Sequence, residues 1–292
     1  MRKLLFITII FFFLVSTADA QNKKKKGYRY ELIGSLGASN FLGDLGGADQ
    51  IGTNGLKDLE LVLTRPAVAI GIRYTIDKYF SVKNNLYWGI VRGDDKLTKE
   101  EFRNNRNIHF KSPVVELSSQ VEFNFLKEQR GHIYRIKTVR GTAHKNWQIY
   151  LFGGGGAVYF NPKAQYNGSW YALKPLETEG VSYKRITGLV SVGGGMRLGI
   201  NNYWGVGFEL GMRKTWSDYM DDVSSTYVDP SIFNGDKIAE HFSNPMEPSN
   251  PLYCYPCTGE QRGDRTDKDA YMFGVATVGY KMMKKKRSRS KF

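Results

Sequence analysis

A stretch of alternating residues around position 200 limits most strongly what this chain can fold into. Between Thr187 and Thr215 the even positions are mostly apolar and the odd positions are small or charged. The even set includes Val190, Val192, Met196, Leu198, Ile200, Trp204, Val206, Phe208, Leu210 and Met212. A period of two indicates β-strands. The pair Asn201-Asn202 between the two runs predicts a two-residue hairpin turn, because asparagine tolerates positive φ.

The composition of the two strand faces indicates what each of them contacts. The odd face combines charged residues such as Arg197 and Glu209 with repeated glycine. A charged face in water would not require glycine, whereas a cramped polar interior would. The apolar face would then contact lipid, and this arrangement is typical of a transmembrane β-barrel.

The N-terminus predicts export. Residues 1–20 combine a basic start, an apolar run from Leu4 to Val15 and the ending Ala18-Asp19-Ala20, which indicates a secretory signal peptide. We expect a basic periplasmic leader at 21–27, the barrel at 28–283 and a basic periplasmic tail at 284–292. No other segment has 18 consecutive apolar residues, so the sequence predicts no membrane-spanning helix.

Alternating segments elsewhere complete an all-β, eight-stranded antiparallel barrel with long extracellular loops. We expect strands at residues 28–41, 65–76, 79–91, 114–126, 147–160, 187–200, 203–215 and 270–283. Short periplasmic turns alternate with longer outer loops, which places both termini in the periplasm of an outer-membrane barrel. The exception is the 20-residue periplasmic connection 127–146. The facing of strand 147–160 stays open because four consecutive glycines interrupt its pattern, and we expect loops at 161–183 and 217–268.

An eight-stranded barrel has an interior just wide enough for side chains. Four basic and four acidic residues are predicted to face it, and such charges must pair if they are to be buried. We interpret this set as a polar plug, with a proton or ion path as the alternative. The eight residues are Glu31, Arg73, Lys83, Glu116, Glu122, Arg197, Glu209 and Arg213.

Aromatic residues at the strand ends predict interfacial girdles. The periplasmic girdle would comprise Tyr74, Tyr79, Trp147, Tyr203, Trp204 and Tyr280. The outer girdle would comprise Trp88, Phe160 and Trp216.

The sequence offers little catalytic chemistry. The four histidines, which belong to no HExxH motif and lie outside the expected strands, are His109, His132, His144 and His241. A hydrolase would need them to converge with other groups, which a sequence does not show. The glycines at 153–156 are not followed by a GK[ST] motif, as a phosphate loop would require. We therefore expect no enzyme, no cofactor and no metal.

Two features of the loop 217–268 leave alternatives open. Cys254 and Cys257 are expected to form at most a local disulfide, with redox activity or metal binding as alternatives. Asp218, Asp221, Asp222 and Asp229 could bind calcium, but they lack the spacing of an EF-hand, which favours a role in ordering the loop.

The basic charge of the chain is concentrated on one side of the expected barrel. Removing the signal peptide lowers the net charge from +14 to +13. Residues 23–26, 127–146 and 281–292 carry +4, +5 and +7, so the rest of the mature chain carries −3. All three segments are expected in the periplasm, where they would bind anionic lipid or an acidic protein surface rather than nucleic acid. The candidate partner-binding residues are Lys127, Arg130, Arg135, Lys137, Arg140, Lys145, Lys284, Lys285, Lys286 and Arg287.

Several segments carry a family resemblance that extends over nearly the whole mature chain. They are GASNFLGDLGG at 37–47, RPAVAIGIRY at 65–74, ELSSQVEFNF at 116–125, GGGGAVYFNPKA at 153–164, PLETEG at 175–180 and RKTWSDYMDDVSSTYVD at 213–229. The chain resembles the PorG-like family of outer-membrane barrels of the type IX secretion system.

This resemblance implies a non-enzymatic part of a secretion machine. By likeness, the chain would link the periplasmic ring of the PorK lipoprotein and PorN to the outer membrane, while cargo crosses through a different, larger barrel. The alternatives are a small porin or transporter, a lipid-modifying barrel enzyme, and a soluble lipocalin-like barrel.

Overall fold

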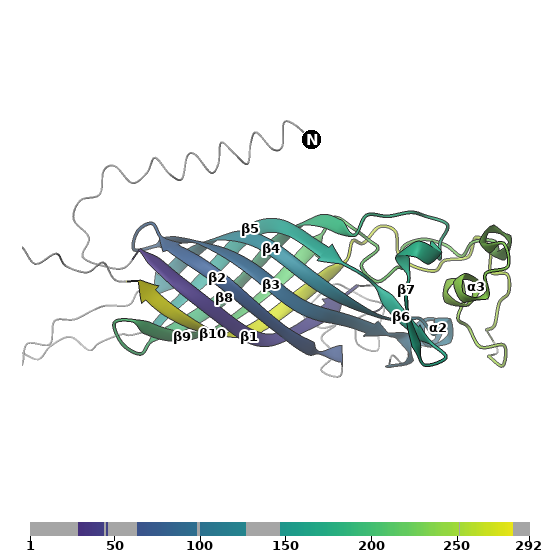
Figure 1. Cartoon of the computed structure of the whole chain (residues 1–292), viewed down its shortest axis with the longest axis horizontal. Coiled ribbons are helices and arrows are strands. Elements are labelled where there is room, and N and C mark those ends of the chain that lie inside the picture. The colour runs from purple at the N-terminus through teal and green to yellow at the C-terminus, as the bar shows by residue number, and fades with distance from the viewer. Residues whose placement is uncertain are drawn as a thin grey trace, which may run out of the picture.

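The structure is a computed structural model that describes residues 29–43, 45, 63–97, 100–126, 147–250 and 252–282. Eight long antiparallel strands in this part of the chain form a closed barrel, which confirms the predicted fold class (Figure 1). Each strand pairs with its neighbours in chain order, and β1 closes the barrel against β10. The strands are β1 (Tyr30–Leu42), β2 (Arg65–Thr75), β3 (Phe80–Asp94), β4 (His109–Leu126), β5 (Trp147–Phe160), β8 (Ile186–Gly199), β9 (Trp204–Thr215) and β10 (Ala270–Met282).

The two ends of the barrel differ in the length of their connections. At one end, which we call the short-turn end, β2 joins β3 through residues 76–79 and β8 joins β9 through 200–203. At the other end, the long-loop end, the smaller elements gather beyond the barrel rim (Figure 1). They are η4 (Asp95–Leu97), α2 (Glu101–Arg106), β6 (Lys163–Tyr166), β7 (Ser169–Ala172), η5 (Lys174–Leu176), η6 (Pro230–Phe233) and α3 (Lys237–Ser243). No helix in the described part of the chain is long and apolar enough to cross a membrane.

The short turns are built by side-chain acceptors. Asn201 Oδ1 accepts hydrogen bonds from the backbone N–H groups of Tyr203 and Trp204, both at 2.8 Å. Asp77 Oδ1 accepts two equivalent bonds at 2.7 Å in the β2–β3 turn. The predicted reason for the Asn201-Asn202 turn was wrong, because neither asparagine has a positive φ and the turn has four residues. Asparagine acts here through its side-chain oxygen.

The outer wall of the barrel is apolar. Leu36, Ile70 and Leu117 are 67, 66 and 64 % exposed, although each lies in the middle of a strand. The opposite face of the same strands is buried or half-buried, as the alternation predicts. A continuous apolar wall around a polar interior is stable in lipid, because the strands satisfy each other's backbone groups.

Glycines on the inner face make room for large side chains. A Cβ on Gly195 would lie 2.5 Å from the Tyr150 hydroxyl, and a Cβ on Gly279 would fall on the Glu31 carboxylate. These close approaches explain why the inner faces of β8 and β10 carry glycine at these two positions. The facing of β5, left open by its sequence, is settled by the burial of Tyr150 and Phe152 on the inner side.

The apolar core lies in the half of the barrel nearest the long-loop end. Aromatic residues fill the interior there, including Phe41, Tyr87, Phe110 and Phe273. Met220 and Phe242 from the β9–β10 connection continue the same core above the rim. The barrel and the elements beyond its rim therefore fold as one packed body.

The girdle prediction holds for every aromatic residue except Phe160. Trp88 and Trp216 are exposed on the outer wall, and the six aromatics predicted for the short-turn end lie at that end. Phe160 is fully buried and stacks on Tyr183, with ring centroids 6.3 Å apart. The outward aromatic of β5 at this level is Tyr159, one residue earlier. The prediction chose Phe160 because the glycine run conceals the facing of the strand in the sequence.

Candidate functional site

All eight charged residues predicted for the interior point into the barrel. The side chain of Arg197 is 11 % exposed, and the other seven residues are almost fully buried. The register makes Glu31 and Arg73 direct cross-strand partners and places Lys83 opposite Arg73 on the next strand. The structure joins the eight side chains in three clusters along the barrel axis.

The first cluster, at the short-turn end, is centred on Arg73. Its Nη1 lies 2.6 Å from Glu31 Oε2, and its Nε and Nη2 lie 2.7 and 3.0 Å from the two oxygens of Glu122. Arg197 Nη1 approaches Glu31 Oε2 at 3.3 Å, and its Nη2 donates to Asn124 at 3.0 Å. Two guanidinium groups and two carboxylates thus form one network, in which Arg73 binds Glu122 with bidentate geometry.

The second cluster is centred on Glu209. Lys83 Nζ lies 2.8 Å from Glu209 Oε2, and the hydroxyl groups of Tyr87 and Tyr150 donate to the same carboxylate at 2.9 Å each. The Tyr150 ring also lies beneath Arg197, whose Cζ is 5.0 Å from the ring centroid. Tyr150 therefore connects the second cluster to the first.

The third cluster is centred on Glu116. Arg213 Nε lies 3.2 Å from Glu116 Oε2, and the hydroxyl groups of Tyr271 and Ser118 donate to the carboxylate at 2.8 and 2.6 Å. The Arg213 guanidinium also faces the rings of Tyr87 and Phe273, at 4.9 and 4.8 Å. The third cluster therefore adjoins the aromatic core described above, and its ion pair contacts the packed rings directly.

The interior is therefore filled from the first cluster to the aromatic core. Removing one partner from a buried ion pair costs about 3–5 kcal/mol, because an uncompensated charge is left behind. Each of these carboxylates has at least one cationic partner. The arrangement can hold the strands in register.

Sequence reasoning missed several members of these clusters. Tyr87, Tyr150 and Tyr271 each donate to a buried carboxylate, and strand parity could have identified Tyr87. Lys281 was assigned to the basic tail, but it is buried on the inner face of β10, directly opposite Glu31. Its position in the alternation of β10 was the available signal.

An ordered cap, formed by residues 95–97, 100–108, 161–185, 216–250 and 252–269, lies beyond the long-loop rim. Arg262, which is fully buried, binds Glu179 Oε1 at 2.7 Å and the backbone oxygens of Asp222 and Ser243 at 2.7 and 3.1 Å. Asp95 accepts hydrogen bonds from Arg106 Nε and Nη2 at 2.8 and 3.0 Å. Segments predicted to be simple loops are thus held by buried ion pairs.

The cap also joins two of the family-like segments, 175–180 and 213–229. Glu179 accepts hydrogen bonds from the backbone N–H groups of Ser224 and Ser225, both at 3.0 Å. Thr178 Oγ1 and the Tyr183 hydroxyl donate to Asp222 at 2.5 and 2.6 Å. These contacts explain why both segments combine acidic and hydroxyl residues.

The acidic run orders this cap. Asp218, Asp221 and Asp222 are buried, and Asp229 caps η6 through a 2.9 Å bond from Ser231 N. Burial raises the pKa of Asp222 to about 6, against the opposing effect of Arg262. Burial likewise raises the pKa of Asp218 to about 6. In the described residues, no three His, Cys, Asp or Glu side chains are arranged to hold a metal ion.

The remaining candidate residues have structural surroundings or lie outside the described residues. Cys254 and Cys257 form a disulfide in the cap. The His241 ring packs on Tyr166 with centroids 4.0 Å apart, and His109 Nε2 accepts a bond from Gln165 N at 3.1 Å. His132 and His144 lie outside the described residues, together with all ten partner-binding candidates, Lys127, Arg130, Arg135, Lys137, Arg140, Lys145, Lys284, Lys285, Lys286 and Arg287.

Solved structures of other proteins share similarity with this chain at low sequence identity. The OprG outer membrane protein of Pseudomonas aeruginosa has 13 % identity and a TM-score of 0.38, with 89 % of this chain and 100 % of that chain covered. The N-terminal β-barrel domain of OprF from the same organism has 10 % identity and a TM-score of 0.34, with 88 and 99 % covered. Ail, the attachment invasion locus protein of Yersinia pestis, has 9 % identity and a TM-score of 0.38, with 88 and 100 % covered.

The family assignment comes from the sequence itself. No curated protein matches this chain. A family model described as a domain of unknown function, DUF6089, matches residues 3–233, which is well over half of the sequence. The chain therefore belongs to the DUF6089 family.

Proposed function

We propose that this chain is a non-enzymatic outer-membrane component of the type IX secretion machinery, and that it anchors periplasmic ring proteins such as PorK and PorN to the membrane. The observation that carries the proposal is the filled barrel. Paired charges and aromatic rings occupy the interior, so the barrel is suited to hold a position in the membrane and not to conduct solutes.

The distribution of basic residues supports an attachment surface at the short-turn end. Asn124 N, near the end of β4, donates to Tyr79 O at 2.7 Å, and Lys281 N, near the end of β10, donates to Tyr203 O at 2.7 Å. The chain therefore leaves β4 and β10 at this end, and the segments that follow, 127–146 and 283–292, carry +5 and +6. A short-turn end that faces the periplasm, as in bacterial outer-membrane barrels, would present these charges to an acidic partner surface.

Charge reversal tests this proposal in the full chain. The variant changes Arg130, Arg135, Lys137 and Arg140 to Glu and removes residues 284–292. A matched control reverses Lys184, Lys237 and Arg265, which are exposed at the long-loop end. Both proteins should insert and keep heat-modifiable gel migration, because the barrel wall and the interior are unchanged.

The two variants should differ in partner binding. The short-turn variant should lose co-purification with the ring proteins and should secrete cargo poorly. High salt should weaken ring recovery by wild type and so reduce its difference from the variant, because salt screens exposed charges. The control should behave like wild type. Full ring recovery and normal secretion in a stably inserted short-turn variant would defeat the docking proposal.

A further inference from the structure

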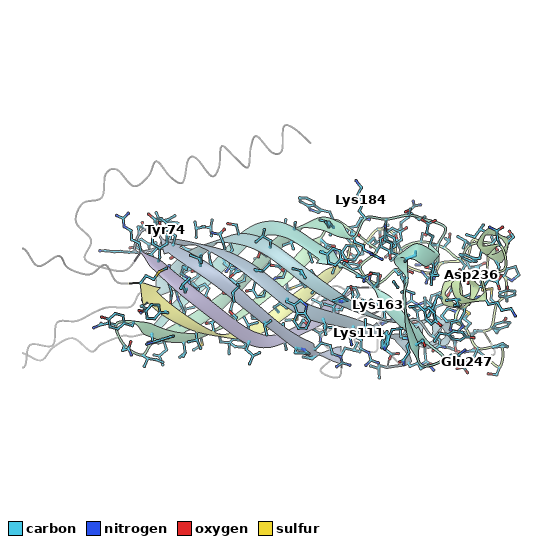
Figure 2. All side chains as sticks on the ribbon, viewed as in Figure 1. Tyr74, Lys111, Lys163, Lys184, Asp236 and Glu247 are labelled. Carbon is cyan, nitrogen blue, oxygen red and sulfur yellow. A yellow bond between two sulfur atoms is a disulfide. The ribbon has the colours of Figure 1, made fainter. Side chains whose placement is uncertain are left out.

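Three cations form a row across the outer wall near the long-loop end. Arg92 on β3 is the direct cross-strand partner of Lys111 on β4, and Lys111 is the partner of Lys163 on β6. Directly paired residues share a face of the sheet. Arg92 and Lys111 belong to the outward sets of β3 and β4, so all three face away from the interior; Figure 2 shows Lys111 and Lys163 close together beside the barrel rim.

Such a row is unfavourable without an anion, since like charges directly opposite each other destabilise a sheet. Arg92 is partly compensated by Asp94, whose Oδ2 lies 3.0 Å from Nη2. Within the described part of the chain, neither Lys111 nor Lys163 has a carboxylate at ion-pairing distance. Lys111 Nζ instead lies 5.5 Å from the centroid of the Trp170 ring, which is 47 % exposed.

The hairpin β6–β7 brings Lys163 and Trp170 to this row. It turns at Asn167 and Gly168, both with positive φ, and its inner face packs Ala164 and Tyr166 against the core. Trp170 pairs with Gln165, which shares the outward face of Lys163. The hairpin therefore extends the barrel wall beside β4 and adds one cation and one indole ring to the outside.

The row lies at the height of lipid headgroups. The last apolar cross-strand pair below it is Ile90 and Pro113, two residues away along each strand. Two residues span about 7 Å, or roughly 5 Å along the membrane normal for a strand tilt of ~40°. The polar layer on each side of the hydrocarbon is roughly 5–8 Å thick, so the three cations fall within it.

We propose that Arg92, Lys111, Lys163 and Trp170 form a binding site for a phosphate-bearing lipid headgroup in the leaflet at the long-loop end. The guanidinium and the two ammonium groups would bind phosphate oxygens. The indole ring would lie at the membrane interface, as tryptophan does in aromatic belts. The headgroup supplies the anion that the row of cations lacks in the protein alone. This site is independent of the secretion role proposed above.

Native mass spectrometry of the full chain in detergent tests the site with lipid A as the probe. Wild type should retain bisphosphorylated lipid A and should retain at least tenfold less of the dephosphorylated form. The variant with Arg92, Lys111 and Lys163 changed to Gln should retain at least tenfold less lipid A than wild type does. A matched control with Lys184, Lys237 and Arg265 changed to Gln should retain it as wild type does, and heat-modifiable migration should show both variants folded.

Three results would overturn the proposal. They are equal retention by wild type and the triple variant, equal retention of the dephosphorylated lipid, and capture of soluble heparin without capture of lipid A. The last result would assign the row to an acidic polysaccharide instead.

Discussion

The Lys83–Glu209 pair gives the sharpest test of how the interior is held together. Changing Glu209 to Gln keeps the size of the side chain but leaves Lys83 without its carboxylate partner at 2.8 Å. It also turns the two 2.9 Å bonds from Tyr87 and Tyr150 from charge-assisted into neutral ones. Stranding one member of a buried pair costs about 3–5 kcal/mol, and we expect a loss of unfolding free energy in that range.

A double variant distinguishes the cost of leaving Lys83 unpaired from the cost of changing the side chains themselves. Lys83→Met with Glu209→Gln removes both charges, and we expect it to be less destabilised than Glu209→Gln alone, by about 2 kcal/mol or more. The free energies would be measured by equilibrium denaturant unfolding in detergent micelles, followed by tryptophan fluorescence. A loss below about 1 kcal/mol for Glu209→Gln, or no rescue in the double variant, would show that the Lys83–Glu209 pair does not stabilise the barrel.

Further predictions concern the wall, the cap and its pH dependence. Phe208→Arg should cost about 2–4 kcal/mol because it places a charge on the lipid face near mid-membrane. Gly207→Trp should cost about 1–3 kcal/mol because it overfills the interior. Normal insertion and unfolding of both variants would show that the assigned facing of β9 is wrong. Replacing both Cys254 and Cys257 with Ala should leave heat-modifiable migration unchanged, because the bridge is local to the cap. Burial raises the pKa of Asp222 to about 6, above its ordinary 3.8, so the stability of the cap should fall as pH rises from about 4 to 6 and then level off. Limited proteolysis of the cap at pH 5 and 7 would measure this. Asp222→Asn should reduce the difference, and Asp218, whose pKa burial also raises to about 6, should account for the rest.

The strands and the inner-facing residues could be predicted from the sequence because both follow from a period of two. Alternation alone places Arg73 and Glu209 inside and Ile70 and Phe208 outside, and the structure agrees. The same rule failed for Phe160, because consecutive glycines in β5 give no contrast between the faces. The facing of a strand can therefore be predicted only where the side chains on its two faces differ.

The cap could not be predicted because its contacts join distant segments. Arg262 binds Glu179 across 83 positions, and no local pattern identifies such a partner. The β6–β7 hairpin was predicted as a loop although Asn167-Gly168 is a strong hairpin signal, because its strands have only four residues each. Lys281 was missed for a third reason. The basic tail adjoins β10 and concealed the inward position of Lys281 in the alternation of that strand.

The filled interior predicts that this barrel does not conduct ions or solutes. Planar-bilayer recording of the purified full chain tests it most directly, with a known porin in the same bilayer as the positive control. We predict no steady open-channel current above the baseline of the bilayer at any voltage at which the bilayer is stable. Reproducible, steady single-channel steps from the wild-type protein would show that the interior is open.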